Sequence, residues 1–336
     1  MRKFIGFVAT VCLTAVLIAG CSGSTANSST TASQQPVASS TPVPAFPEDP
    51  AYIEEREIVY ANVDDVALKL DLYRPVEGDG PFPAIVFMAS GSWISANRDE
   101  YFTHSTWAAD RGYVAVTIDR RGTIESDDDG QPKYPFPAPL HDVKCAVRWL
   151  RSNAEELGID PDRIGAVGYS DGGHFALLLA LTDPSDGLEG DCGDSSQSSR
   201  VQAAVNVGGD PDLAFVYDAF PNTAQSGLSR LLGGNPEEQP EEYRLASPNT
   251  YVSEGDPPVL TIYGDLDGDV FIKPLELLDL EMKEAGASHT LIILELVGHR
   301  GLMPKGYAPP NVAHDPDPEL YETVFEFLDS QLMNEN

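Results

Sequence analysis

The sequence predicts an α/β protein with a mostly parallel central sheet and helices on both faces. Short continuous apolar runs, typical of strands buried on both faces, alternate with segments of helical length from about residue 80 onwards. Strands and helices that alternate at this spacing are typical of parallel sheets, because each crossover needs room for a helix. The chain has 336 residues and a hydrophobic content of 42%, which is enough for a sizeable core.

The folded domain is predicted over residues 51–336. Residues 58–61 and 67–73 alternate in polarity around a turn at 62–65, which predicts an antiparallel hairpin. Residues 142–157 carry apolar side chains at helical spacing and predict a helix that packs on the sheet. Further strands are expected at residues 84–88, 113–119, 164–167, 201–207, 259–263 and 290–296, and further helices at 106–111, 175–181, 225–232, 275–285 and 319–332.

An insertion at about residues 208–255 separates two of the predicted strands. A connection of this length inside a compact domain commonly contributes to a site or forms a small subdomain. We therefore expect a small cap over the carboxyl end of the sheet. The alternative is a solvated connection whose aromatic residues pack against its own helix.

The first fifty residues are predicted to lie outside the fold. Residues 1–20 combine basic residues with an apolar run that is too short for a stable membrane span, as in a signal peptide. The run ends in Ile-Ala-Gly-Cys, which resembles a bacterial lipobox and predicts lipidation of Cys21; an ordinary secretory signal is the alternative. Residues 21–50 are rich in Ser, Thr and Pro, the composition of a disordered linker. We expect export to the cell envelope and a bacterial membrane anchor through this lipid alone.

Charge and cysteine content restrict the partners further. A formal net charge of −32 argues against nucleic acid and against electrostatic attraction to anionic lipid headgroups. Cys12 leaves with the signal peptide and Cys21 takes the lipid, so Cys145 and Cys192 remain and are predicted to form a disulfide in the oxidising compartment. Two unrelated thiols are the alternative. No cysteine and histidine cluster has metal-ligand spacing, so we expect no metal.

A candidate nucleophile lies between the strand at 164–167 and the helix at 175–181. The turn from residue 168 reads Gly-Tyr-Ser-Asp-Gly-Gly, which is the pattern Gly-x-Ser-x-Gly in the strand–turn–helix context that gives the pattern its meaning. This turn exposes the hydroxyl of Ser170 above the sheet, and its glycines have no Cβ that would clash with nearby backbone. It also directs the N–H of Asp171 at an oxyanion beside Ser170. A chance match in a glycine-rich turn is the alternative.

A nucleophilic serine needs a base within hydrogen-bond reach and an acid that orients the base. In folds with this turn the acid precedes the histidine, and each follows the end of a strand. Asp267, after the strand at 259–263, is the first candidate for the acid; Asp265 is the second candidate and is expected to stabilise the loop instead, and Asp269 is expected on the surface. His299 closely follows the last strand and is the candidate base. The other histidines fit less well in order or position: His104, His141, His174, His289 and His314.

A second set of oxyanion donors is expected where the strand at 84–88 ends. The residues that follow, at 89–93, are Ala-Ser-Gly-Ser-Trp. In folds with this nucleophile turn, the loop at this place supplies backbone N–H groups to the oxyanion. We therefore predict an oxyanion hole formed by the N–H groups of Ser90, Gly91 and Asp171.

Three further segments carry a family resemblance. They are Asp-Leu-Tyr-Arg-Pro at 71–75, the helix and lead-in strand at 142–164, and the approach to the acid loop at 247–260. With the nucleophile turn, residues from about 70 to 332 resemble the acetyl-esterase and feruloyl-esterase-like branch of the α/β-hydrolase superfamily, close to the hormone-sensitive-lipase type. The resemblance implies an α/β-hydrolase fold with a catalytic triad of Ser170, Asp267 and His299.

One segment departs from the family pattern. Where the family has His-Gly-Gly-Gly-Trp, this chain has Ala-Ser-Gly-Ser-Trp at 89–93. Because the donors are backbone N–H groups, a hole from Ser90 or Gly91 together with Asp171 can survive the change. The carboxylate of Asp171, where the family often has alanine, is expected to oppose oxyanion formation modestly.

The resemblance implies an exported, lipid-anchored serine carboxylester hydrolase that acts on short-acyl or aryl esters without a cofactor. The substrate is a small molecule or an acetyl or feruloyl group on a polysaccharide, by family analogy alone. A prolyl-oligopeptidase-like peptidase is a second hypothesis, although such enzymes usually carry a propeller domain that the N-terminal residues cannot form. A non-catalytic, carbohydrate-binding surface lipoprotein on a hydrolase scaffold is a third hypothesis, which the altered 89–93 segment favours and the three triad residues oppose.

Overall fold

The computed structural model describes residues 51–219, 223–267, 269–303 and 318–333. The predicted signal peptide and linker, with Cys12 and Cys21, lie outside these residues, and so does His314. Among the helices of the described residues, none combines the length and the apolar character that crossing a membrane requires.

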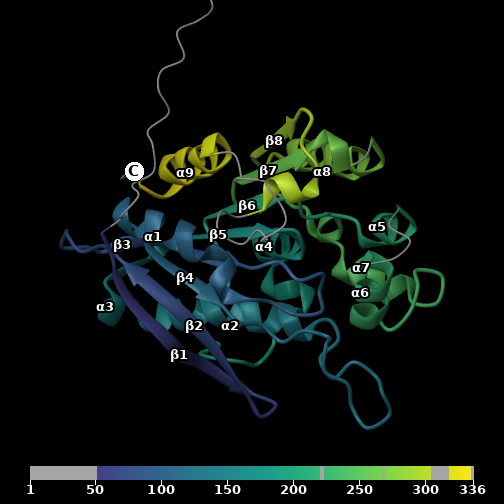
Figure 1. Ribbon diagram of the computed structural model, residues 1–336, viewed down its shortest axis with the longest axis horizontal. Coiled ribbons are helices and arrows are strands. Elements are labelled where there is room, and N and C mark those ends of the chain that lie inside the picture. The colour runs from purple at the N-terminus through teal and green to yellow at the C-terminus, as the bar shows by residue number, and fades with distance from the viewer. Residues whose placement is uncertain (1–50, 220–222, 268, 304–317, 334–336) are drawn as a thin grey trace, which may run out of the picture. The chain divides into compact units, whose positions relative to one another are not determined.

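An eight-stranded sheet forms the centre of the described chain, in the order β1-β2-β4-β3-β5-β6-β7-β8 (Figure 1). β1 (Ile53–Val63) and β2 (Val66–Arg74) form the predicted hairpin at one edge, and β2 is antiparallel to β4. All the other neighbouring strands are parallel, which confirms the predicted sheet. The remaining strands are β3 (Phe82–Met88), β4 (Val114–Ile118), β5 (Ile159–Tyr169), β6 (Ala203–Val207), β7 (Val259–Gly264) and β8 (His289–Leu294).

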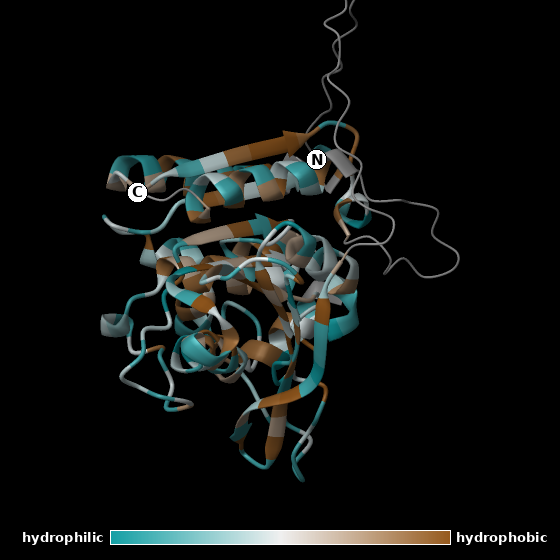
Figure 2. Cartoon of the chain, turned by 90° about the vertical axis from the view of Figure 1, so that its left-hand side faces the viewer, coloured by the Kyte–Doolittle hydropathy of each residue, from teal (hydrophilic) through white to brown (hydrophobic). Residues whose placement is uncertain are grey.

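Helices cover both faces of the sheet. One hydrophobic cluster contains residues of α2 (Ala138–Ser152), α4 (Asp171–Leu181) and α8 (Asp269–Ala285). A second cluster contains residues of α1 (Phe102–Asp110) and α9 (Pro318–Leu332). Successive side chains of a strand point to opposite faces, so neighbouring residues of β3 belong to different clusters. Figure 2 shows hydrophobic residues along the central strands, whereas many of the loops are hydrophilic.

Several predicted elements differ from the observed ones in their bounds; α1 and α8, for example, begin four and six residues earlier than expected. The helix expected over residues 142–157 is divided into α2 and α3 (Ala154–Leu157), because Asn153 leaves helical geometry and its side chain donates to the Trp149 carbonyl. A hydrogen-bonding side chain of this kind competes with the helical backbone. β5 begins at Ile159 rather than near residue 164, so the strand that leads to Ser170 is longer than its apolar run.

The predicted insertion contains α5 (Leu213–Ala219), α6 (Thr223–Leu232) and α7 (Pro240–Ala246). Its buried residues join the same hydrophobic cluster as α4. Arg230 in α6 donates to the Thr123 carbonyl at 2.9 Å, and the Leu231 carbonyl accepts from the N–H of Phe136. The insertion therefore contacts the loop that follows the carboxyl end of β4.

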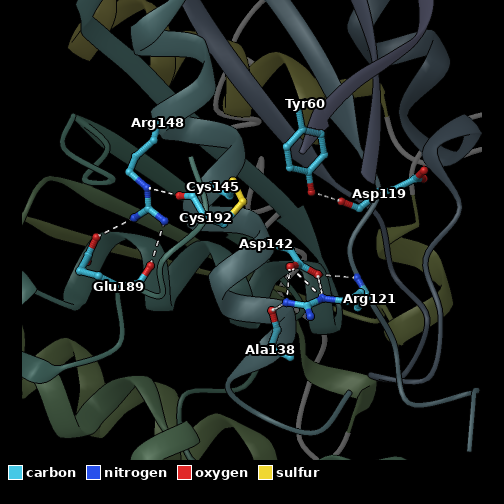
Figure 3. Close-up of a disulfide and its surroundings, with 9 residues drawn as sticks. All are labelled: Tyr60, Asp119, Arg121, Ala138, Asp142, Cys145, Arg148, Glu189 and Cys192. Atoms are coloured by element: carbon cyan, nitrogen blue, oxygen red, sulfur yellow. Dashed lines mark hydrogen bonds and ion pairs between the residues drawn. A yellow bond between two sulfur atoms is a disulfide. The ribbon is translucent and has the colours of Figure 1, made fainter. Parts of the chain in front are cut away.

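A disulfide joins Cys145 in α2 to Cys192, with the two Cα atoms 5.4 Å apart (Figure 3). The side chain of Arg148, one turn further along α2, donates to the carbonyl of Cys192 and to the carboxylate of Glu189, each at 3.0 Å. Residues 187–202 contain no helix or strand. A covalent bond and an ion pair therefore hold this irregular segment against α2.

Candidate active site

The turn that carries Ser170 is strained and tightly packed. Ser170 lies between β5 and α4 at φ 57° and ψ −124°, a conformation that costs a non-glycine residue about 1–3 kcal/mol and is found mostly at functional sites. A Cβ atom at Gly168 would lie 2.0 Å from the Gly172 carbonyl oxygen, and one at Gly172 would lie 2.1 Å from that of Met88. Only glycine fits at both positions, as the motif requires.

The imidazole of His299 lies beside this serine. His299 Nε2 is 2.9 Å from Ser170 Oγ, which is hydrogen-bond distance between a base and a nucleophile. The hydroxyl of Tyr169 donates to the His299 carbonyl at 2.8 Å, and the two rings lie 5.1 Å apart. Gly208, at φ 66°, lies against the same imidazole, and a Cβ atom there would be 3.4 Å from His299 Cε1, at ordinary contact distance. Residues 130 positions apart are thus held in contact at the carboxyl edge of the sheet.

The predicted acid loop follows β7 and lies against the loop that bears His299. The N–H of Leu266 donates to the Val297 carbonyl at 3.0 Å, two residues before His299. Asp265 accepts the N–H of Leu296 at 2.6 Å, so Asp265 stabilises the loop as expected. Asp267 ends a short 3-10 helix, Asp265–Asp267, but its side chain lies outside the described part of the chain. Its pairing with His299 stays a prediction.

The loop after β3 places its backbone donors on two buried carboxylates. Glu100 accepts the N–H of Ser90 at 3.1 Å and its hydroxyl at 2.8 Å. Asp171 accepts the N–H groups of Gly91 at 2.6 Å, Ser92 at 2.9 Å and Trp93 at 3.0 Å. Both predicted oxyanion donors in this loop, the N–H groups of Ser90 and Gly91, are therefore bonded to carboxylates in the structure. The N–H of Asp171, the first residue of α4, has no acceptor among the described residues.

Arg120 is the counterion of Asp171. Its guanidinium is ion-paired with the Asp171 carboxylate and also donates to the Ala89 carbonyl at 2.9 Å. It lies 4.9 Å above the ring of Phe175, one helical turn after Asp171. Asp171 is only 1% exposed and Arg120 7% exposed. The expectation that this carboxylate opposes an oxyanion needs correction, because a buried cation neutralises its charge.

Two residues of this loop adopt a conformation that glycine prefers. Ser92 and Trp93 have φ values of 54° and 61°, in the left-handed region. Each non-glycine residue there costs about 1–2 kcal/mol, because its Cβ approaches the following carbonyl. The three hydrogen bonds to Asp171 offset this cost.

His174 connects three parts of the site. Trp93 Nε1–H donates to His174 Nδ1 at 3.2 Å, and His174 Nε2 is 2.7 Å from the carbonyl of Ala246 at the end of α7. Since the indole can only donate, Nδ1 is the acceptor and Nε2–H the donor. Complete burial lowers the pKa of His174 to about 4, so the ring is neutral. Its structural role agrees with the expectation that it is not the base.

Two further observations on the described residues concern metal ligands and a cavity. No group of three or more His, Cys, Asp or Glu side chains among them could hold a metal ion. An open cavity of about 750 Å³ beside the disulfide is lined by residues that include Tyr60, Tyr134 and Phe136, and none of the predicted triad or oxyanion residues borders it.

Several known proteins are similar to this chain. A family model described as BD-FAE matches residues 70–281. Esterase LipC of Mycobacterium tuberculosis is 31% identical over 226 residues, which are 64% of this chain and 51% of that protein. The chain spans about half the length of the curated relatives it matches.

Solved structures match over more of their length. Esterase 2 of Thermogutta terrifontis, which has been solved with propionate bound and phosphorylated by paraoxon, is 27% identical, with TM-scores of 0.66 and 0.65. These matches cover 86% of this chain and 98% of that one. A truncated carbohydrate esterase from gut microbiota is 26% identical, with a TM-score of 0.70 over 86% of this chain and 99% of that one. The predicted α/β-hydrolase fold is confirmed.

Glu100 is expected to make the stability of the fold depend on pH. Glu100 is 1% exposed, and burial raises its pKa from 4.5 to about 7. Glu100 therefore contributes fully to the free energy of unfolding below pH 4.5, and this contribution is lost as the pH rises through 7. In Glu100→Gln the amide can bond both groups of Ser90 without a charge. This variant should resemble wild type at pH 4.5 and exceed it at pH 8 by about 3 kcal/mol in free energy of unfolding.

Urea denaturation at the two pH values measures this difference. Glu125→Gln is the control, because Glu125 is an exposed glutamate whose loss should change neither curve. A Glu100→Gln variant that loses the same stability at both pH values would contradict the assignment.

Proposed function

This chain belongs to the BD-FAE family, and on that premise we propose that it is a serine carboxylester hydrolase. One observation supports the proposal most directly: His299 Nε2 lies 2.9 Å from the hydroxyl of a serine on a strained strand-to-helix turn. A hydroxyl is a weak nucleophile unless a base next to it accepts its proton. The proposed activity depends on this pair of side chains.

The reaction proceeds through an acyl-enzyme. Ser170 Oγ attacks the ester carbonyl while His299 accepts its proton, and Asp267 orients and stabilises the imidazolium. The negative charge that develops on the carbonyl oxygen is stabilised by the N–H of Asp171 and by the positive end of α4. His299 then protonates the leaving alkoxide. Water, activated by the same imidazole, hydrolyses the acyl-enzyme and restores Ser170.

The substrate class is proposed from the relatives. Short-acyl or aryl esters fit the esterases that this chain resembles, one of which has been solved with propionate bound and another of which is called a carbohydrate esterase. Acetyl or feruloyl groups on a polysaccharide are the finer form of this proposal. The insertion contacts α4 through the bond between the Ala246 carbonyl and His174, which supports a role for the insertion in shaping the substrate pocket.

The place of action is proposed from the first fifty residues. Their charged start, apolar run and Ile-Ala-Gly-Cys ending support export and lipidation at Cys21. The Ser/Thr/Pro-rich segment that follows is long enough to hold an enzyme away from a membrane surface and close to an extracellular substrate.

Ser170 should be the residue that reacts with organophosphorus probes. We expect a fluorophosphonate to label the wild-type protein and to leave Ser170→Ala unlabelled, because only a hydroxyl with an adjacent base attacks the phosphorus. Hydrolysis of p-nitrophenyl acetate should fall by at least about 10⁴-fold in the same variant. Ser196→Ala, in an exposed loop, is the control. An unlabelled wild type would end the hydrolase proposal, and faster cleavage of a dipeptidyl anilide than of the ester would favour a peptidase.

Asp267 and Asp265 should differ in kinetic effect. Asp267→Asn should lower kcat by about 10³–10⁴-fold with little change in KM, because the imidazole loses the carboxylate that orients it. Asp265→Asn keeps an oxygen that accepts the N–H of Leu296, and it should lose less than about tenfold in kcat. Steady-state kinetics on p-nitrophenyl esters of increasing acyl length compare the two. The reverse order of effects would assign the acid to Asp265.

Cys21 should carry the anchor. In a bacterial host, labelled palmitate should enter the wild-type protein, and the protein should sediment with membranes. Cys21→Ser should lose both properties, because serine cannot form the thioether. A Cys21→Ser protein that still sediments with membranes after a carbonate wash would contradict the proposed anchor.

A further inference from the structure

Four consecutive backbone N–H groups, at residues 90–93, donate to side-chain carboxylates rather than to backbone carbonyls or solvent. Three of the four donate to one residue, Asp171, which lies about 80 positions away in sequence and immediately after the nucleophile. A carboxylate that accepts several N–H groups fixes their relative positions strongly, because charge-assisted hydrogen bonds are short and directional. Asp171 therefore determines the path of this loop.

Arg120 completes the same arrangement from the other side. Its guanidinium contacts the Asp171 carboxylate and the Ala89 carbonyl, so a single side chain contacts both the start of α4 and the end of β3. Arg120 and Asp171 are both buried, and within the described chain the pair lies between the loop and the ring of Phe175. The planar guanidinium reaches the two acceptors with two different nitrogens, Nη1 for Ala89 and Nη2 for Asp171, a fixed geometry that a lysine ammonium group lacks.

The loop is held in a conformation that its own residues disfavour. Ser92 and Trp93 both lie in the left-handed region, and Ser92 stands where the family pattern has glycine. The loop has little room to relax, because a Cβ atom at Gly227 of α6 would lie 2.3 Å from the Ser92 carbonyl oxygen. The hydrogen bonds to Asp171 stabilise the left-handed conformation that a glycine at residue 92 would adopt without strain.

We propose that Asp171 and Arg120 are positioning residues for the oxyanion side of the active site. They hold the loop at residues 90–93 against the start of α4, so that the carbonyl oxygen of the substrate is presented to the N–H of Asp171 in one orientation. The proposal rests on the proposed hydrolase function. It assigns to the Asp171 carboxylate a role that differs from that of its backbone N–H.

Two measurements on the full chain test this role. In Asp171→Asn, an amide NH2 replaces the oxygen that accepts from the N–H of Trp93 and from the Arg120 guanidinium. These two donors then have no acceptor in the side chain. Hydrogen exchange of the backbone in residues 90–93 should become at least about tenfold faster, while exchange in β5 and α8 stays at the wild-type rate. In p-nitrophenyl acetate hydrolysis, kcat should fall by about 10–100-fold and KM should stay within about threefold of wild type. The reason is that a displaced loop at residues 90–93 affects binding of the transition state more than binding of the substrate.

Ser92→Gly provides the rescue. Glycine adopts the left-handed conformation without strain, so the loop depends less on Asp171 when residue 92 is glycine. The double variant Asp171→Asn/Ser92→Gly should have a kcat at least about fivefold higher than that of Asp171→Asn. The kcat of Ser92→Gly alone should stay within about twofold of wild type. If Asp171→Asn does not fold, Asp171→Ala/Arg120→Met removes the contacts without leaving a buried charge unpaired, and it should show the same loss of kcat.

Asp256→Asn is the matched control. Asp256 is also a buried carboxylate, and it accepts the N–H of Ser253 at 2.7 Å and faces Arg200, but it precedes the amino end of β7. The Asp256→Asn variant should have a lower free energy of unfolding than wild type and an unchanged kcat. Wild-type kcat in Asp171→Asn, or a higher kcat, would overturn the positioning role; the higher value would mean that the carboxylate occupies donors the oxyanion needs. A wild-type protein without esterase activity counts against the proposed function instead, and the exchange experiment still reports on the loop.

Discussion

The site depends on a steric constraint: backbone atoms around Ser170 approach more closely than any side chain allows. Hypothetical Cβ atoms at Gly168 and Gly172 would lie within about 2 Å of carbonyl oxygens. This contact brings β3, β5 and the start of α4 together, and the Ser170 N–H extends the connection to the Val207 carbonyl of β6 at 2.8 Å. The three strands and the helix are therefore in close contact at this turn, and a strained serine persists only where its surroundings determine its conformation.

Around this rigid turn, buried polar groups satisfy one another. Asp171, Glu100, Arg120 and His174 are almost completely buried, and hydrogen bonds connect each of them to the loop after β3 or to the residues that flank it. Buried ion pairs contribute little net stability, because the loss of hydration opposes their attraction. Their value here lies in specifying one arrangement of the loop. An apolar replacement of similar volume would fill the space without selecting a single path for the backbone.

Much of this could be predicted from the sequence, because the signals are local. The strand–turn–helix context of Ser170, the glycine before His299 and the apolar periodicity of the strands each lie within a few residues. The partner of Asp171 could not be predicted in the same way, because the loop it binds is about 80 residues away and no local pattern connects them. A signal was present in two departures from the family pattern, the loss of glycine at residue 92 and the gain of a carboxylate at residue 171. Taken separately, neither departure predicts a contact between these two residues. The start of β5 and the break at Asn153 cannot be predicted from hydrophobicity, because backbone pairing and a side-chain hydrogen bond determine them.

The bond between His174 and the Ala246 carbonyl also bears on how this scaffold could be re-engineered. The acceptor is a main-chain atom at the end of a short helix, so it persists whichever small residue occupies position 246, provided that the helix ends there. A cap transplanted from another hydrolase would therefore need to place one backbone carbonyl beside His174 Nε2 rather than to reproduce a particular sequence. A cap that places no carbonyl there would leave an imidazole proton without an acceptor in a dry interior, and Trp93 would lose its fixed partner.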